Sequence, residues 1–247
     1  MRMNLPQGTK AMIFAAGLGT RLKPFTDHHP KALALVNQKP LLQRNIEYLA
    51  GFGIKDIIIN VHHFADQVTG FLESRNNFGL NISISYEMHE PLETGGGLKN
   101  AEWFFKDCTT PFIVMNADIL TNMDLGKMYS FHQDKKGIAT LAVTNRTSTR
   151  NLLFDENSLL VGWENINTGE QKISRPAGIH HKGAFSGVHL IEPALVGLIH
   201  QQGKFSIIDT YLELAKTENI FVFDHTGDEV VDVGKPESIT KAEKIFK

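Results

Sequence analysis

The sequence of 247 residues has little that would direct it to a membrane, a disulfide scaffold or a nucleic acid. Its one cysteine, Cys108, excludes an internal disulfide framework and favours a reducing compartment. No apolar run reaches the roughly 20 residues of a membrane-spanning helix, and the N-terminus has no signal-peptide core. The net charge of -2 lacks the basic excess of proteins that bind nucleic-acid backbones. We therefore expect a cytoplasmic protein without a membrane or nucleic-acid partner.

The two commonest phosphate-binding motifs are also missing. The P-loop pattern Gly-x-x-x-x-Gly-Lys-Ser/Thr does not occur. A dinucleotide fingerprint would need glycine at position 22, where Leu22 stands, and an acidic residue closing the second strand, where Asn60 stands. The sequence therefore excludes a P-loop enzyme and a typical dinucleotide-binding domain.

What the sequence does have is a glycine-rich loop after an apolar segment at 10–16, which is predicted to be a buried strand. The residues of this loop that carry the pattern are, in order, Gly17, Gly19, Arg21, Pro24, Thr26, Pro30 and Lys31. Glycines let backbone N–H groups approach an anion closely. Arg21 and Lys31 add fixed positive charge. The pattern predicts a loop that binds phosphate groups.

Strand-like and helix-like segments alternate after this loop. Strands are predicted at 10–16, 56–61, 81–87 and 112–115, and helices at 40–52, 65–73, 95–105 and 125–133. This order predicts an α/β, Rossmann-like fold: a mostly parallel sheet flanked by helices on both faces. Ligands of such sheets bind at the carboxyl ends of the strands.

The second half of the chain has more alternation and more turn residues. Residues 138–192 are predicted to form a small antiparallel lobe over the edge formed by the carboxyl ends of the strands. Helices are predicted at 193–200 and 207–216, then a strand pair at 221–223 and 230–233, and a closing helix from residue 236. No linker is evident, so residues 1–247 are expected to form a single domain.

Two distant aspartates each stand at the end of a predicted strand. Asp118 follows the strand at 112–115 and its Asn116-Ala117 turn, and Asp232 lies in the run Val-Asp-Val-Gly that ends at Gly234. Carboxylates in such places hold Mg²⁺ together with substrate phosphates. Aspartates at strand ends also stabilise turns, so the residues alone leave both interpretations open.

A third motif, Thr94-Gly95-Gly96-Gly97, opens the helix predicted at 95–105. Three glycines there can expose backbone N–H and C=O groups to the flat edge of a ligand. The alternative is that Thr94 caps the helix and the glycines are only flexible.

Taken together, these motifs resemble the signature of the sugar-1-phosphate nucleotidyltransferases. The resemblance implies an enzyme that moves a nucleotidyl group from a nucleoside triphosphate to a sugar 1-phosphate, without a general base or a covalent intermediate. It implies catalytic roles for Arg21 and Lys31, and Mg²⁺ held by Asp118 and Asp232. The nucleotide-binding residues that it implies are Ala15, Ala16, Gly17, Gly19, Thr20, Thr94, Gly95, Gly96 and Asn116. The family usually has glycine where Ala117 stands, and a positive φ would be strained there.

The run from Glu90 to Gly97, with Asn60-x-His62 and Phe185-Ser186-Gly187, is similar to the N-acetylmuramate-1-phosphate uridylyltransferases of cell-wall recycling. That branch implies UTP, N-acetylmuramate 1-phosphate and no C-terminal β-helix. The sugar-binding candidates are Glu164, Ser186 and Gly187. A lactyl carboxylate would need a cation, for which the candidates are Arg150, Lys172, Arg175 and Lys182.

Other assignments remain open at this point. A mannose-1-phosphate guanylyltransferase, or a glucose-1-phosphate thymidylyl- or uridylyltransferase, would have the same loop. A catalytically silent nucleotide-binding subunit would be expected to lack a metal-binding acid or the lysine, and this sequence lacks neither. The histidines form no Cys- or His-based zinc pattern. The protein is expected to be a monomer or a homodimer.

Overall fold

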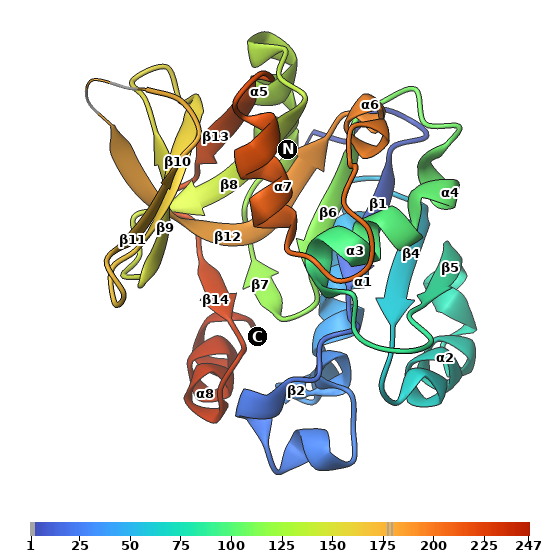
Figure 1. Cartoon of the computed structure of the whole chain (residues 1–247). Coiled ribbons are helices and arrows are strands. Elements are labelled where there is room, and N and C mark those ends of the chain that lie inside the picture. Colours follow the sequence, from blue (N-terminus) through green and yellow to red (C-terminus); the bar gives the residue numbers. More distant parts are fainter. Residues whose placement is uncertain (1–2, 177, 179) are drawn as a thin grey trace.

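The computed structural model describes residues 3–176, 178 and 180–247, and a ten-stranded mixed sheet forms its centre (Figure 1). Four neighbouring strands are parallel in the order β6-β1-β4-β5. Their bounds are Phe112–Asn116, Lys10–Phe14, Asp56–Val61 and Asn81–Tyr86. The predicted α/β fold with a largely parallel central sheet is confirmed.

Alternate residues of β1 face two different layers of helices, which is why the strand is apolar throughout. Ala11 and Ile13 pack toward α1 (Leu41–Ala50), α2 (Ala65–Ser74) and α5 (Leu125–Lys135). Met12 and Phe14 pack toward α3 (Glu93–Asn100), α4 (Glu102–Phe105), α6 (Pro193–Gly197) and α7 (Ile207–Leu214). Where a single helix was predicted at 95–105, the structure has the two short helices α3 and α4.

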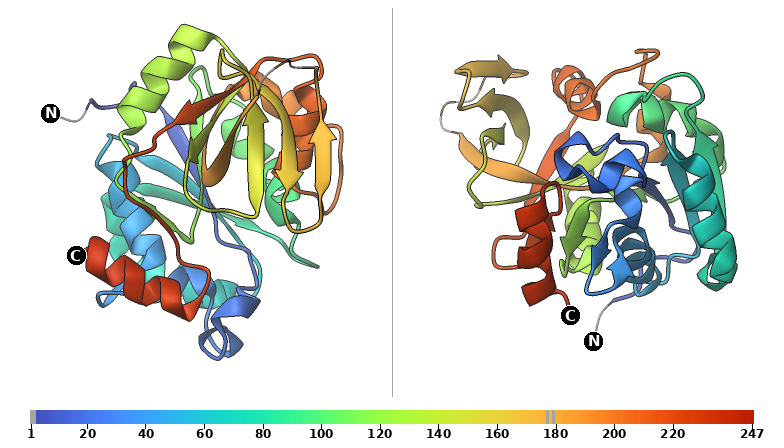
Figure 2. Two further views of the ribbon diagram at one scale, coloured as in Figure 1. Left: turned by 90° about the vertical axis from the view of Figure 1, so that its left-hand side faces the viewer. Right: turned by 90° about the horizontal axis from the view of Figure 1, so that it is seen from below.

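The other half of the sheet is mostly antiparallel. β12 (His181–Ile191) pairs antiparallel with β6, with β8 (Ala139–Thr144) and with β9 (Arg150–Phe154). Beyond β9 lie β10 (Leu160–Asn165) and β11 (Glu170–Ile173). We call β9, β10 and β11 the antiparallel lobe, and Figure 2 shows it projecting from one side of the molecule. β12 thus joins the two halves.

The strand pair predicted between 221–223 and 230–233 is wrong. β13 (Ile220–Asp224) pairs parallel with β8, and β14 (Val230–Asp232) pairs antiparallel with β7 (Ile119–Thr121). The chain turns away from the sheet at His225, whose Nε2 lies 2.7 Å from the buried Ser186 hydroxyl. This turn carries β14 to the strand that follows Asp118 (Figure 1).

The phosphate loop and the C-terminal helix share a third apolar cluster. The cluster contains Leu22 of the short helix η1 (Thr20–Leu22) and Ala242 of α8 (Pro236–Ile245). It also contains Leu120 of β7 and Val231 of β14. The remaining short elements are η2 (Phe25–Asp27), η3 (Lys31–Leu33), β2 (Leu35–Val36), β3 (Lys39–Pro40) and η4 (Asn76–Gly79). Among the described residues no helix is both long and apolar enough to span a membrane.

Candidate active site

A cavity of about 530 Å³ lies at the carboxyl ends of the parallel strands. Its wall includes most of the residues predicted to bind nucleotide or to act in catalysis: Ala15, Ala16, Gly17, Gly19, Thr20, Arg21, Lys31, Thr94, Asn116 and Asp118. Carboxyl ends of parallel strands meet at one edge of the sheet, so residues far apart in the sequence are brought together there.

Gly19 allows the phosphate loop to close on Lys31. Its φ of 62° is left-handed, and a Cβ at this position would lie 2.8 Å from Cβ of Lys31 and 3.0 Å from Cγ2 of Thr26. The Thr26 hydroxyl donates to the Gly19 carbonyl over 3.0 Å. The loop thereby holds Arg21 and Lys31 at the cavity wall.

The pairing of β14 with β7 brings the two distant aspartates together. Asp232 lies opposite Ile119, the residue after Asp118, and the Val233 N–H donates to the Asp118 carbonyl over 2.8 Å. A three-residue strand therefore positions the second acid beside the first.

Three positively charged side chains lie near these two carboxylates. Lys31 Nζ forms an ion pair with Asp118 Oδ2, and the two side chains are 12% and 24% exposed. Although Asp232 is exposed as a residue, the protein packed around its carboxyl group raises the pKa of Asp232, and the charge of Asp118 raises it further. Lys31, Arg21 and Arg146 act in the opposite direction.

The donor set of this site fits a hard divalent cation such as Mg²⁺. Two carboxylates converge there, and oxygen ligands are the ones that Mg²⁺ prefers. No group of three or more His, Cys, Asp or Glu side chains is arranged to hold a metal within the described ranges. A metal ion at Asp118 and Asp232 would therefore depend on substrate phosphates for further ligands.

Gly234 leaves room for two charged groups. A Cβ here would lie 2.7 Å from Asp232 Oδ1 and 2.8 Å from Arg21 Nη2. The glycine that ends the Val-Asp-Val-Gly run therefore lets Arg21 and Asp232 approach the same point.

The strain considered at Ala117 does not occur, because Ala117 is not among the residues with a positive φ. Its N–H donates to the Phe14 carbonyl over 3.0 Å, and Asn45 Nδ2 donates to its carbonyl over 2.9 Å. A small residue with an ordinary backbone is enough before Asp118.

Gly95 and Gly96 do not line the cavity, and their amide groups are already bonded. Both N–H groups donate to the Phe205 carbonyl, over 2.9 and 3.3 Å. A Cβ at Gly95 would lie 2.4 Å from the Phe205 ring, and one at Gly96 would lie 2.1 Å from the Gly203 carbonyl. These glycines are needed for close packing, which corrects the expectation that their N–H groups face a ligand.

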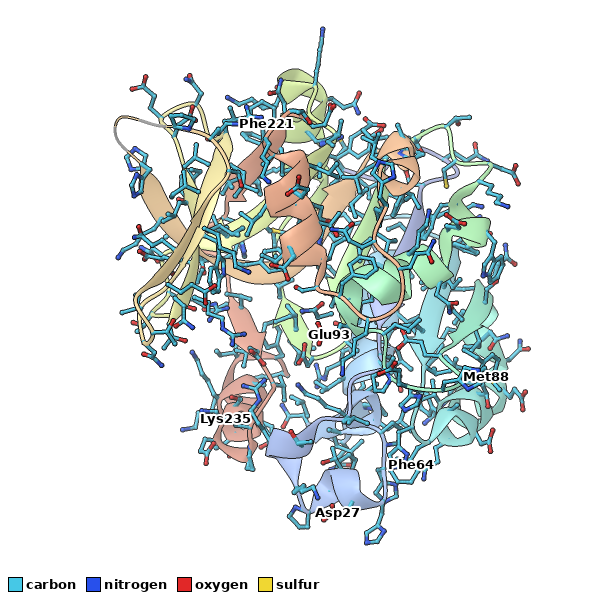
Figure 3. The ribbon with its side chains drawn as sticks, in the orientation of Figure 1. Asp27, Phe64, Met88, Glu93, Phe221 and Lys235 are labelled. Atoms are coloured by element: carbon cyan, nitrogen blue, oxygen red, sulfur yellow. The ribbon has the colours of Figure 1, made fainter. Side chains whose placement is uncertain are left out.

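Thr94 does line the cavity, but it caps a different helix from the one expected. Its hydroxyl accepts from the Ile207 N–H, at the start of α7, over 3.0 Å. The residue before it, Glu93, also lines the cavity and has a φ of 59°, unusual for a residue other than glycine. Figure 3 labels Glu93 at this place.

The cavity wall also contains residues that were not predicted as binding residues, among them Asn60, Glu87 and Lys204. Asn60 and Glu87 stand at the ends of β4 and β5. Ligands bind at the carboxyl ends of parallel strands, so the argument that predicted Asp118 also applies to these two residues. Lys204 lies in the loop before α7, which has no motif.

None of the three sugar-binding candidates lines the cavity. Ser186 is fully buried against His225, and Gly187 packs against the Asn116 side chain with a φ of 70°. Glu164 Oε1 accepts from Asn151 Nδ2 over 3.0 Å and lies 3.3 Å from Lys182 Nζ. The hydrogen bond from Asn151 and the nearby Lys182 lower the pKa of Glu164. All three residues therefore make contacts within the protein and not at the cavity wall.

Three of the candidate cations already have partners. Lys172 donates to Asp209 over 2.8 Å, and Arg175 donates to the Glu218 carbonyl over 2.8 Å. Lys182 is the partner of Glu164, and Arg150 is exposed on β9. Arg146, which was not predicted, is half-buried, donates to the Phe185 carbonyl over 2.9 Å, and its charge acts on Asp232.

Comparison with known proteins gives both a family match and a fold match. A model of the family described as "Nucleotidyl transferase" matches residues 10–151. A mannose-1-phosphate guanyltransferase of Yarrowia lipolytica is 29% identical over 92% of this chain, and a UTP–glucose-1-phosphate uridylyltransferase of Synechocystis is 27% identical over 92%. This chain spans 61% and 60% of those two proteins.

The crystal structure of HddC from Yersinia pseudotuberculosis, complexed with GMP-PN, is 26% identical and superposes with a TM-score of 0.77. That alignment covers 97% of this chain and 100% of HddC. The similarity therefore extends beyond the matched segment, through the antiparallel half.

Proposed function

The chain belongs to the nucleotidyl transferase family, and on that basis we propose that it transfers a nucleotidyl group from a nucleoside triphosphate to a sugar 1-phosphate. The products are a nucleotide sugar and pyrophosphate. The observation that carries this proposal is the convergence of Arg21, Lys31, Asp118 and Asp232 around one cavity that ends the parallel strands.

The phosphate loop holds the triphosphate in this mechanism. Backbone N–H groups of the loop and the guanidinium of Arg21 bind the outer phosphates, which leave as pyrophosphate. Gly234 keeps Arg21 close to Asp232, so the leaving group and the acids occupy neighbouring parts of the site.

An oxygen of the sugar phosphate attacks the α-phosphorus, and the bond from that phosphorus to the bridging oxygen of pyrophosphate breaks. The second pKa of a phosphate monoester is about 6, so the attacking oxygen is already ionised at neutral pH and needs no general base. Lys31 stabilises the negative charge on the α-phosphate in the transition state. Alignment and charge stabilisation account for catalysis, as in other phosphoryl-type transfers.

Asp118 and Asp232 would hold Mg²⁺, as their carboxylate oxygens fit that ion. Bound there, the ion would neutralise the repulsion between the two phosphate-bearing substrates. Lys31 pairs with Asp118, so its ammonium group lies beside the carboxylates that would hold the ion.

The finer hypothesis, UTP with N-acetylmuramate 1-phosphate, stays a prediction from the run between Glu90 and Gly97. A guanylyl donor is the second candidate, since mannose-1-phosphate guanyltransferases and the GMP-PN complex of HddC are among the relatives. A silent subunit is disfavoured because both acids and both cations line or adjoin the cavity, and because Ala117 is unstrained.

The test is pyrophosphate release with Mg²⁺, crossing UTP, GTP, ATP and dTTP with four sugar 1-phosphates: N-acetylmuramate, N-acetylglucosamine, glucose and mannose. Turnover with one pair well above the rest identifies the substrates. Turnover with GTP and mannose 1-phosphate would keep the mechanism and reject the muramate hypothesis. Tight nucleotide binding without turnover by any pair would contradict the proposed enzyme and favour the silent subunit.

A further inference from the structure

A chain of three hydrogen bonds joins two loops whose residues line the same cavity. The Ala15 N–H, at the start of the phosphate loop, donates to Asn60 Oδ1 over 2.7 Å. Asn60 Nδ2 donates to Glu87 Oε1 over 2.6 Å. The other oxygen, Glu87 Oε2, accepts from the Leu92 N–H over 2.7 Å, just before α3.

The chain is closely enclosed. Asn60 is 2% exposed and Glu87 is 3% exposed, although both belong to the cavity wall. A Cβ on Gly97 would lie 2.7 Å from Asn60 Nδ2 and 2.8 Å from Glu87 Oε1, so α3 closes directly over the pair. His62 Nδ1 also lies 2.7 Å from the Glu87 carbonyl and fixes the backbone there. Both side chains are therefore closely packed against α3.

The direction of every hydrogen bond in the chain is fixed by its two ends. Ala15 and Leu92 both offer N–H donors, so the side chains between them must accept at both ends. One amide and one carboxylate satisfy this need, because the amide accepts from Ala15 and donates to the carboxylate, which also accepts from Leu92. Two carboxylates would repel each other, and two amides would leave two donors facing each other.

We propose that Asn60 and Glu87 are positioning residues for the nucleotide: they set the separation between the Ala15 loop and the Leu92 loop, and so the width of the slot between them. This inference rests on the proposed function, because the slot is the part of the cavity assigned to the nucleotide. Ala15 and Ala16 of the first loop and Pro91, Glu93 and Thr94 of the second all line the cavity.

The effect is confined to one substrate. The chain of hydrogen bonds has no contact with Lys31, Asp118 or Asp232 in the described part of the structure. A change in slot width therefore weakens nucleotide binding and raises the KM for the nucleotide, while the KM for the sugar phosphate changes little. A displacement of about 1 Å in a positioning element is enough for a large loss.

The experiment exchanges the amide and the acid. Glu87→Gln alone places an NH₂ group against a donor, and Asn60→Asp alone places two carboxylates side by side. The double variant Asn60→Asp/Glu87→Gln restores every bond: the carboxylate at position 60 accepts from Ala15 and from the new amide, whose carbonyl accepts from Leu92. It also keeps the total charge. Affinity for UTP and for GTP is measured by calorimetry with Mg²⁺ and without sugar phosphate, so that no turnover occurs.

We expect each single variant to bind the preferred nucleotide at least tenfold more weakly, and the double variant to bind within threefold of the unmodified chain. Glu47→Gln makes the same substitution on the surface of α1, where Glu47 accepts from Lys39 and Gln43, and should bind as the unmodified chain does. Thermal unfolding of all variants separates a loss of folding from a loss of positioning.

Two results would overturn the inference: single variants that bind as the unmodified chain does, or a double variant no tighter than the two single losses combined. A double variant that regains its unfolding temperature but not its affinity would make the pair purely structural and would also overturn it. Absence of nucleotide binding by the unmodified chain would instead remove the proposed function, and the inference with it.

Discussion

The parallel strands and the antiparallel lobe place their charged residues differently. At the ends of β1, β4, β5 and β6, side chains from distant segments meet in one cavity. In the antiparallel lobe, Glu164 is engaged with Asn151 and Lys182, and Lys172 with Asp209. Strand direction explains the contrast. Parallel strands bring all their carboxyl ends to one edge, whereas the register of antiparallel strands determines which neighbours a side chain contacts.

Replacing charged residues at the ends of the parallel strands should lower turnover more than any other change. Lys31→Ala should lower kcat by about 10²–10³-fold, because it removes the cation that stabilises charge on the α-phosphate. Asp118→Asn should have an effect of similar size. Pyrophosphate release measures both, and thermal unfolding should remain close to that of the unmodified chain because Asp118 retains access to water.

Lys39→Ala is the matched control for this prediction, since Lys39 pairs with Glu47 on the surface over 2.7 Å and is not among the residues of the cavity wall. It should leave kcat unchanged. A near-native rate for Lys31→Ala would contradict the assignment of the parallel strand ends as the catalytic region.

A smaller effect is expected from crowding the point where Arg21 and Asp232 approach each other. Gly234→Ala would place a Cβ 2.7 Å from Asp232 Oδ1 and 2.8 Å from Arg21 Nη2, so both groups must shift. We expect kcat/KM to fall by roughly 10- to 100-fold from misplaced charges. Gly197→Ala, where a Cβ meets nothing within 4 Å, is the control and should be neutral. Equal activity of the two variants would show that this approach is not needed for catalysis.

The sequence predicted the parallel half well because β1, β4 and β6 contain apolar runs and β5 alternates apolar with polar residues. Asp118 could be placed from its strand alone. The neighbour of Asp232 could not, because β14 has three residues and such a short strand carries no information on register. The roles of Gly95 and Gly96 were also hidden. A missing Cβ does not say whether a ligand or a loop fills the space, and here Phe205 and Gly203 fill it.

The strand that joins the two halves should make stability depend on pH. His189 of β12 is fully buried, its Nδ1 lies 2.7 Å from the Tyr211 hydroxyl, and burial lowers the pKa of His189 to about 3. The unfolded chain binds a proton there near pH 6.5, and the folded chain does not. This contribution to stability is therefore complete above pH 6.5 and is lost as the pH falls toward 3, at about 1.36 kcal/mol per pH unit.

Urea unfolding at pH 7, 6 and 5 measures how the free energy of unfolding changes with pH. His189→Gln should reduce the number of protons taken up on unfolding by one, and so make this change smaller. The variant retains the slope from His132 and His225, since burial lowers the pKa of each of these histidines too. If the free energies of unfolding of the two proteins changed in parallel with pH, His189 would not be the group responsible.

Two arginines near the second half of the sheet should differ in their effect on the sugar phosphate. Arg146 donates to the Phe185 carbonyl, and its charge acts on Asp232, whereas Arg175 is bonded to the Glu218 carbonyl after α7. Arg146→Ala should therefore raise the KM for the sugar phosphate by about three- to tenfold, the effect of one charge-assisted hydrogen bond. Arg175→Ala should lower the unfolding temperature and leave that KM unchanged.

Comparing N-acetylmuramate 1-phosphate with N-acetylglucosamine 1-phosphate separates two roles for Arg146. The first sugar has a lactyl carboxylate and the second does not, while both have the phosphate. A larger effect on the first would assign Arg146 to the carboxylate, and an equal effect would assign it to the phosphate. If instead Arg175→Ala alone raised the KM, the segment after β11 and not the segment after β8 would provide the sugar contact.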